Sequence, residues 1–218
     1  MSTNASDEVF IRYDGAWAQC SKSGTAMNVL LDHPVRCLLA GLAIAALALA
    51  AWVLTGPVDP RGLISIVLRF IHVFAAMVWI GLVFFVNFIQ LQVLGEADAA
   101  SRSTISRWIV PRVASAFRHA SHLTVLSGAL LLISTGYLWG DMWPLPAMML
   151  TAGALGGLLM WGFVNLAIWP SLKIVLGHTA GDASAQNRAR QTVKRYARLN
   201  LILALPVTFL MLAAAHLR

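Results

Sequence analysis

The fold is decided by residues 70–95, which read FIHVFAAMVWIGLVFFVNFIQLQVLG and contain no Asp, Glu, Lys or Arg. An α-helix needs about 20 apolar residues to cross the hydrocarbon layer of a membrane, so this stretch is long enough for one crossing. Four further uncharged stretches reach a similar length, at residues 37–58, 119–140, 142–172 and 199–217. The sequence therefore predicts an all-α fold, an integral membrane bundle of five transmembrane helices.

The composition of the whole chain agrees with this prediction. Of its 218 residues, 59% are hydrophobic and 11% are charged, and the mean hydropathy is +0.73. Domains that fold in water carry about 45–50% apolar and about 25% charged residues, so a water-soluble globular enzyme is excluded. The only sizeable hydrophilic part is residues 1–35. We expect these to form a polar N-terminal tail and residues 36–218 to form the transmembrane domain.

The basic residues are concentrated on one side of the predicted bundle. The link between the first and second spans holds only Arg61, with Arg69 at the edge of the second span, and the link between the third and fourth spans holds none. Cytoplasmic loops of membrane proteins are enriched in Lys and Arg. We therefore expect a bacterial inner (plasma) membrane protein with a cytoplasmic N-terminus and an outside C-terminus. We expect the net charge of +7 to serve contact with anionic lipid, not nucleic acid. The other two links carry Arg102, Arg107, Arg112 and Arg118, and Lys173, Arg188, Arg190, Lys194, Arg195 and Arg198.

Polar side chains inside the spans are the candidates for a functional site, because ionisable groups in lipid are costly. No Asp or Glu lies within a predicted span, which argues against an ion-driven transporter or a proton pump. His72 lies about 14 Å inside the second span, close to the bilayer middle. On a helical wheel it shares one direction with Trp79, Val83 and Gln90, so the second span carries one polar stripe.

Four amides are predicted to form a polar intramembrane cluster at a similar depth in the cytoplasmic half. They are Asn87 and Gln90 of the second span, Asn165 of the fourth and Asn200 of the fifth. The alternative role for these amides is interhelical hydrogen bonding that fixes the bundle.

Histidine in a helix bundle points to haem, because neutral imidazole is the usual axial ligand of haem iron and bundles build cofactor sites from facing side chains. A six-coordinate haem b needs two ligands at similar depth. His72 with His122 of the third span fits this best, and His72 with His119 is the next choice. The alternative for His72 is a hydrogen bond to a neighbouring hydroxyl or carbonyl.

Other cofactor attachments are less well supported. Arg69, one turn before His72, is placed to neutralise a haem propionate, or it snorkels to the interface. Cys20 and Cys37 do not form a C-x-x-C-H motif, so no covalently attached haem c is expected. A copper permease or chaperone is a third alternative, against which the eight Met residues argue because they form no repeated M-x-x-M track.

The second span also resembles a family signature. His72, Trp79 and Gly81, followed by Asn87-Phe88 and Gln90, fit the pattern H-x6-W-x-G…N-F-x-Q of bacterial urate hydroxylase (urate oxidase) membrane domains. The similarity covers roughly residues 62–217. It continues in Pro111-Arg112, Phe117-Arg118-His119-Ala120, Thr124, Gly128, Asn165 to Pro170, Asn200 to Met211 and His216.

The resemblance implies a multi-helix membrane oxidoreductase module. In that family a C-terminal cytochrome c domain often accepts the electrons, whereas the present sequence reaches Arg218 without one. The H-x6-W-x-G element is also similar to that of small membrane protoporphyrinogen oxidases, which hold haem b, and of copper-resistance membrane proteins. The resemblance thus implies a ligand role for His72, with weaker correspondences at His119 and His216.

Two functions remain open at this point. The first is a haem b-binding electron-transfer protein, in which Trp79, Arg118 and the amide cluster line the site and a cytochrome c-type protein is the electron partner. The second is a non-catalytic accessory subunit of a larger respiratory or other energy-converting membrane complex. In that case the polar residues only hold the helices together and the N-terminal tail docks on other membrane subunits.

Overall fold

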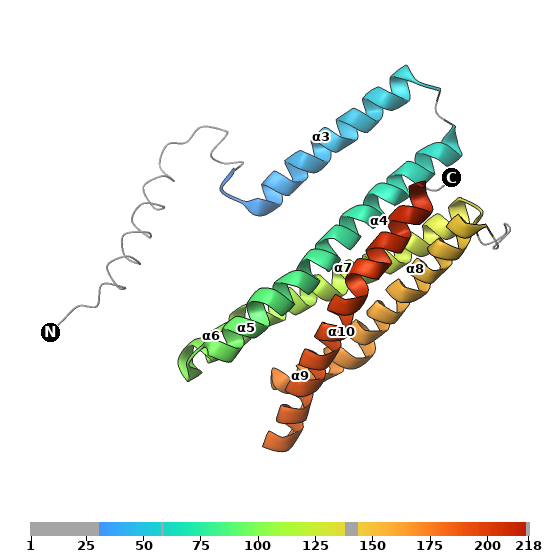
Figure 1. The fold of residues 1–218 in the computed structure, drawn as a ribbon. Coiled ribbons are helices and arrows are strands. Elements are labelled where there is room, and N and C mark those ends of the chain that lie inside the picture. Colours follow the sequence, from blue (N-terminus) through green and yellow to red (C-terminus); the bar gives the residue numbers. More distant parts are fainter. Residues whose placement is uncertain (1–30, 58, 138–143, 217–218) are drawn as a thin grey trace. The chain divides into compact units, whose positions relative to one another are not determined.

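The computed structural model describes residues 31–57, 59–137 and 144–216, and every regular element in these residues is a helix (Figure 1). The contacts divide the chain into two units, Met1–Val58 and Asp59–Arg218. Of the predicted N-terminal tail, only residues 31–35 are described. Five helices are long and apolar enough to cross a membrane, which confirms the predicted all-α fold with five candidate spans.

The first unit contributes helix α3 (Pro34–Thr55). Pro34 begins this helix, where its missing N–H would have no intrahelical partner in any case. Apart from Arg36 near its start, the helix is apolar throughout. A helix of this composition can bury its surface only in lipid or against another protein surface.

The second unit contains four long helical segments, most of them made of several elements. They are α4 (Pro60–Phe85) with η1 (Val86–Gln90) and α5 (Leu91–Glu96), α6 (Ala99–Trp108) with α7 (Val110–Ser134), α8 (Leu145–Gly162) with η3 (Phe163–Ile168) and α9 (Trp169–Val175), and α10 (Ala183–His216).

These segments run alternately up and down, with α4 against α7 and α8 against α10 (Figure 1). The α5–α6 turn and the start of α10 lie at the same end, which we call the basic end because most of the basic residues lie in or near it.

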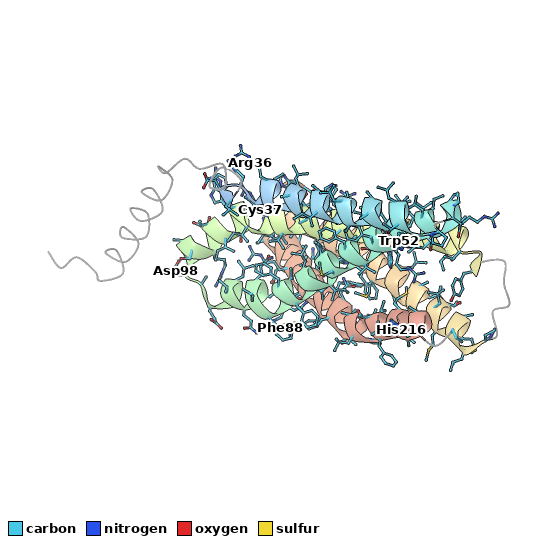
Figure 2. The ribbon with its side chains drawn as sticks, turned by 90° about the horizontal axis from the view of Figure 1, so that it is seen from above. Arg36, Cys37, Trp52, Phe88, Asp98 and His216 are labelled. Atoms are coloured by element: carbon cyan, nitrogen blue, oxygen red, sulfur yellow. The ribbon has the colours of Figure 1, made fainter. Side chains whose placement is uncertain are left out.

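The core of the second unit lies between the four segments. Trp79, Phe117 and Met160 meet there with small residues such as Ala120 and Ala204. Large apolar side chains cover the outside instead, and Phe88, 53% exposed, points away from the bundle (Figure 2). Small residues inside and large apolar residues outside are the usual arrangement when helices pack in lipid.

The helices begin earlier than the uncharged stretches suggest, because aspartates cap them. Asp59 accepts a hydrogen bond from the Gly62 N–H at 2.8 Å, so α4 begins ten positions before Phe70. Asp98 and Asp182 cap α6 and α10 in the same way. A capping carboxylate satisfies an N–H that has no partner in the first helical turn. The basic segment before Leu199 is therefore helical and not a loop.

Helix α8 approaches α10 along a row of glycines. A Cβ on Gly156 would lie 2.6 Å from Val207 Cγ2, and one on Gly153 would lie 3.3 Å from Met211 Cγ. Gly157, the next residue in the chain, has nothing within 4 Å of the same position. The close approach of the two helices therefore depends on Gly153 and Gly156.

Candidate functional site

His72 lies on α4 and is held by the backbone of α7. Its Nδ1 is 2.9 Å from the Thr124 carbonyl oxygen and 3.3 Å from Ser127 Oγ. A carbonyl oxygen can only accept, so Nδ1 carries the proton and Nε2 carries the lone pair. Nε2 has no hydrogen bond to any residue in the described part of the chain. The ring lies against Gly128, where a Cβ would come within 2.9 Å of His72 Cε1.

The other predicted histidine ligands have different partners. His122 faces α8, where its Nδ1 accepts a hydrogen bond of 3.0 Å from Trp161 Nε1. His119 is exposed, and its Nδ1 bonds the Ser115 carbonyl oxygen at 2.7 Å within its own helix. His216 is likewise exposed near the end of α10 (Figure 2). His72 and His122 thus contact different helices, and their joint role as haem ligands stays a prediction.

The polar stripe that begins at His72 on α4 continues into η1, and its later residues are buried. Trp79, Asn87 and Gln90 all lie inside the bundle, as does Asn200 of α10. Several of their polar atoms have no hydrogen-bond partner among the described residues: Trp79 Nε1, Asn87 Oδ1, Gln90 Oε1 and both amide atoms of Asn200. Unpartnered buried polar atoms are uncommon in native structures and call for an explanation.

Asn87 and Gln90 line one cavity of about 60 Å³ near the basic end. Both residues belong to η1. Val164 and Ile168 line the same cavity and belong to η3, which continues α8. Each segment closes with a bond from residue i to residue i−5, from Leu91 N–H to the Val86 carbonyl and from Trp169 N–H to the Val164 carbonyl. Single π-helical turns inside longer helices are frequent at functional sites.

Asn165 belongs to a second group, formed with Arg118. Arg118 Nε donates to Asn165 Oδ1 at 3.3 Å, and Asn165 Nδ2 donates to the Trp161 carbonyl oxygen at 3.0 Å. The Arg118 guanidinium also lies 4.5 Å from the centroid of the Trp169 ring, which lines the cavity. The predicted amide cluster therefore divides, with Asn87 and Gln90 at the cavity and Asn165 beside Arg118.

Arg69 lies apart from these groups, since it is exposed on α4. No site role was predicted for Thr124, Ser127, Trp161 or Trp169, although Thr124 and Trp169 lie within the quoted resemblance. The first two could have been found, because Thr124, Ser127 and Gly128 follow one another at spacings of three and one along α7, which puts polar and small residues on one helix face. The two tryptophans carry no such signal, because aromatic residues in apolar helices are common for packing alone.

Comparison of the chain with protein-family models, with curated proteins and with solved structures gives no match. The resemblance to urate hydroxylase membrane domains stays a prediction from the residues quoted above.

Proposed function

We propose that this chain is a multi-pass protein of the bacterial inner membrane that binds haem b through His72 and takes part in electron transfer. The observation that supports this is the setting of the His72 ring, with Nδ1–H on the Thr124 carbonyl and an uncommitted lone pair on Nε2. Metal-ligating histidines almost always donate their other ring N–H to a carbonyl or carboxylate, which fixes the tautomer. A bound haem would supply one-electron redox chemistry, with the axial ligand tuning its potential.

The residues present would supply one nitrogen ligand to this group. His72 of α4 offers Nε2, while its Nδ1 is held by α7. His122 offers no free lone pair in the observed arrangement, because its Nδ1 accepts from Trp161 and its proton is then on Nε2. A second ligand from His122 requires that the Trp161 bond breaks. Arg118 and the amides lie toward the basic end, where they would line that side of the site.

The proposed orientation of the chain in the membrane is supported by the residues of the basic end. Trp108 is 52% exposed there, and the Arg107 and Arg112 guanidinium carbons lie 5.5 and 5.4 Å from its ring centroid. Tryptophan and arginine together at a helix end are typical of a membrane interface. Arg102 closes the adjoining turn by donating to the carbonyl oxygens of Leu94 and Ala97. We propose that this end faces the cytoplasm and contacts anionic lipid, with the N-terminus on the same side.

A second candidate function is a non-catalytic accessory subunit of a larger membrane complex. The observation that favours it is α3, which is long and apolar. The bond between Trp161 and His122 also fits a purely structural role for the histidines. In this case α3 or the N-terminal tail would contact other membrane subunits.

A pyridine haemochrome assay with metal analysis, on gently solubilised full-length protein, separates the two functions. The redox proposal predicts about one haem b per chain, lost in His72→Ala and retained in His216→Ala. The second variant is a matched control because His216 is exposed and bonds only its own helix. Protein without haem that purifies with other chains, and loses them when residues 1–35 are deleted, would refute the redox proposal and support the accessory subunit.

A further inference from the structure

The cavity between η1 and η3 is lined by two hydrogen-bond acceptors that have no donor among the described residues. Asn87 Oδ1 and Gln90 Oε1 are both buried and both unpartnered among the described residues, and both side chains line the cavity. We propose that this cavity is a binding site for a small neutral hydrogen-bond donor and that water fills it.

The orientation of the Asn87 amide does not depend on an arbitrary choice between its nitrogen and oxygen. The Nδ2 group lies 2.9 Å from the Val83 carbonyl oxygen and 3.1 Å from the Ala197 carbonyl oxygen. Carbonyl oxygens only accept hydrogen bonds, so the NH₂ group must face them. Oδ1 is therefore fixed as an acceptor. Because no described residue donates to it, a bound ligand must supply the donor.

The size of the cavity suits water. A cavity must offer about 10–15 Å³, measured with a water-sized probe, to hold one water molecule, so a cavity of about 60 Å³ is large enough for water. The lining of the cavity begins at Val110, the first residue of α7, at the basic end. It extends along α7 as far as Phe117, about 10 Å of helix rise.

A metal cation is the less suitable occupant. Amide oxygens do bind hard cations, but none of the described residues that line this cavity carries a carboxylate, and the Arg118 guanidinium lies against Trp169 in its wall. A cation there would be buried without a counter-charge, which is strongly unfavourable. Neutral donors satisfy the same oxygens without that penalty.

Asn200 lies close to the same region. It follows Ala197, whose carbonyl oxygen accepts from Asn87, by one helical turn on α10. Neither of its amide atoms has a hydrogen-bond partner in the described part of the chain. Waters in the cavity would extend toward this residue and toward Trp79 Nε1, which is also an unpartnered donor on the same stripe of α4. The inference is thus a wet, amide-lined pocket that runs from the basic end into the bundle, independent of whether His72 binds haem.

Water-edited solid-state NMR on the full-length protein in lipid bilayers, with ¹⁵N-labelled Asn, Gln and Met, tests this directly. We expect magnetisation from water to reach the side-chain amides of Asn87 and Gln90 at least several-fold faster than the backbone amide of Met160, which is fully buried in the apolar core. Equal, slow transfer to all three would show a dry cavity and overturn the proposal.

A matched pair of variants checks the site. Gln90→Leu removes one acceptor, so transfer to the Asn87 amide should fall several-fold, whereas Gln92→Leu makes the same change on the exposed side and should leave it unchanged. If Gln90→Leu does not fold, the wild-type measurement alone decides. The thermal midpoint of the wild-type protein should be the same in sodium chloride and in choline chloride. A rise specific to sodium would overturn the neutral ligand in favour of a cation.

Discussion

Replacing Gly128 by Ala tests whether the His72 ring packs directly against Gly128 of α7. The new methyl carbon would lie 2.9 Å from Cε1 and 3.1 Å from Nδ1 of His72, well inside the usual carbon contact distance of about 3.5–4.0 Å. The ring must move by about 0.6 Å or more, which stretches its 2.9 Å bond to the Thr124 carbonyl beyond good hydrogen-bond geometry.

The size of the effect follows from three contributions. Overpacking of this kind destabilises by about 1–3 kcal/mol, and an interhelical hydrogen bond in a membrane protein contributes about 0.6 kcal/mol on average. The higher helix propensity of Ala offsets about 1 kcal/mol of this loss. We expect Gly128→Ala to lower the free energy of unfolding by about 0.6–2.6 kcal/mol, seen as a lower thermal midpoint in detergent.

The same substitution in a His72→Ala background makes the test specific. Without the imidazole there is no clash, so Gly128→Ala should there be neutral or stabilise the protein by up to about 1 kcal/mol. If Gly128→Ala has the same effect in both backgrounds, the His72 ring is not what the glycine accommodates, and our reasoning about the site is wrong.

Three further predictions follow from single contacts. Gly156→Ala should lower the thermal midpoint because of Val207, whereas Gly157→Ala, with nothing within 4 Å, should leave it unchanged or raise it, and equal effects would contradict the packing of α8 on α10. Trp161→Phe removes the donor to His122 and should destabilise by about 0.6–1.7 kcal/mol while leaving the ¹⁵N signals of the His72 ring in place; a change in those signals would mean that the two histidines are coupled. Hydrogen bonds from the Ser101 N–H and hydroxyl hold the pKa of the Asp98 carboxyl below its ordinary value of 3.8. Its contribution to the α5–α6 turn is therefore complete above pH 3.8 and is lost as the pH falls through the lower folded-state pKa, and the NMR shift of the Ser101 amide should follow this titration in the wild type but not in Asp98→Ala.

The number of helices could be predicted from the sequence, but their first residues could not be placed by charge alone. Uncharged stretches mark the apolar part of a helix, and a helix can extend well past it into charged sequence, as α10 does from Ala183. The better signals were Asp59, Asp98 and Asp182, because each caps the helix that follows it. Hydropathy reports on the surroundings of a helix, whereas capping reports on its ends.

The candidate ligands of α7 show a related limit. The depth of His119 and His122 in the span predicts them as haem ligands, but depth does not give the direction in which a side chain points. At 100° per residue, His122 and Thr124 lie about 160° apart around the helix, so both cannot face α4. The buried face of α7 is marked by Phe117, Ala120, Ser121, Thr124 and Ser127, which recur at three- and four-residue spacings. That periodicity was present in the sequence.

The cavity could not have been predicted from one helix at a time. Asn87 is an ordinary amide in an apolar helix until its NH₂ group meets two carbonyls, one from its own helix and one from α10, which leaves its oxygen facing the space between η1 and η3. The π-helical turns place this space at the same level in two helices that are not neighbours in sequence. His72 of α4 and Asn87 of η1 thus lie on one continuous helical segment but differ in their hydrogen-bond partners. The imidazole donates to the backbone of α7, whereas the Asn87 amide oxygen has no donor among the described residues. Loss of His72 should therefore leave the hydration of the cavity unchanged, and the two sites can be tested one without the other.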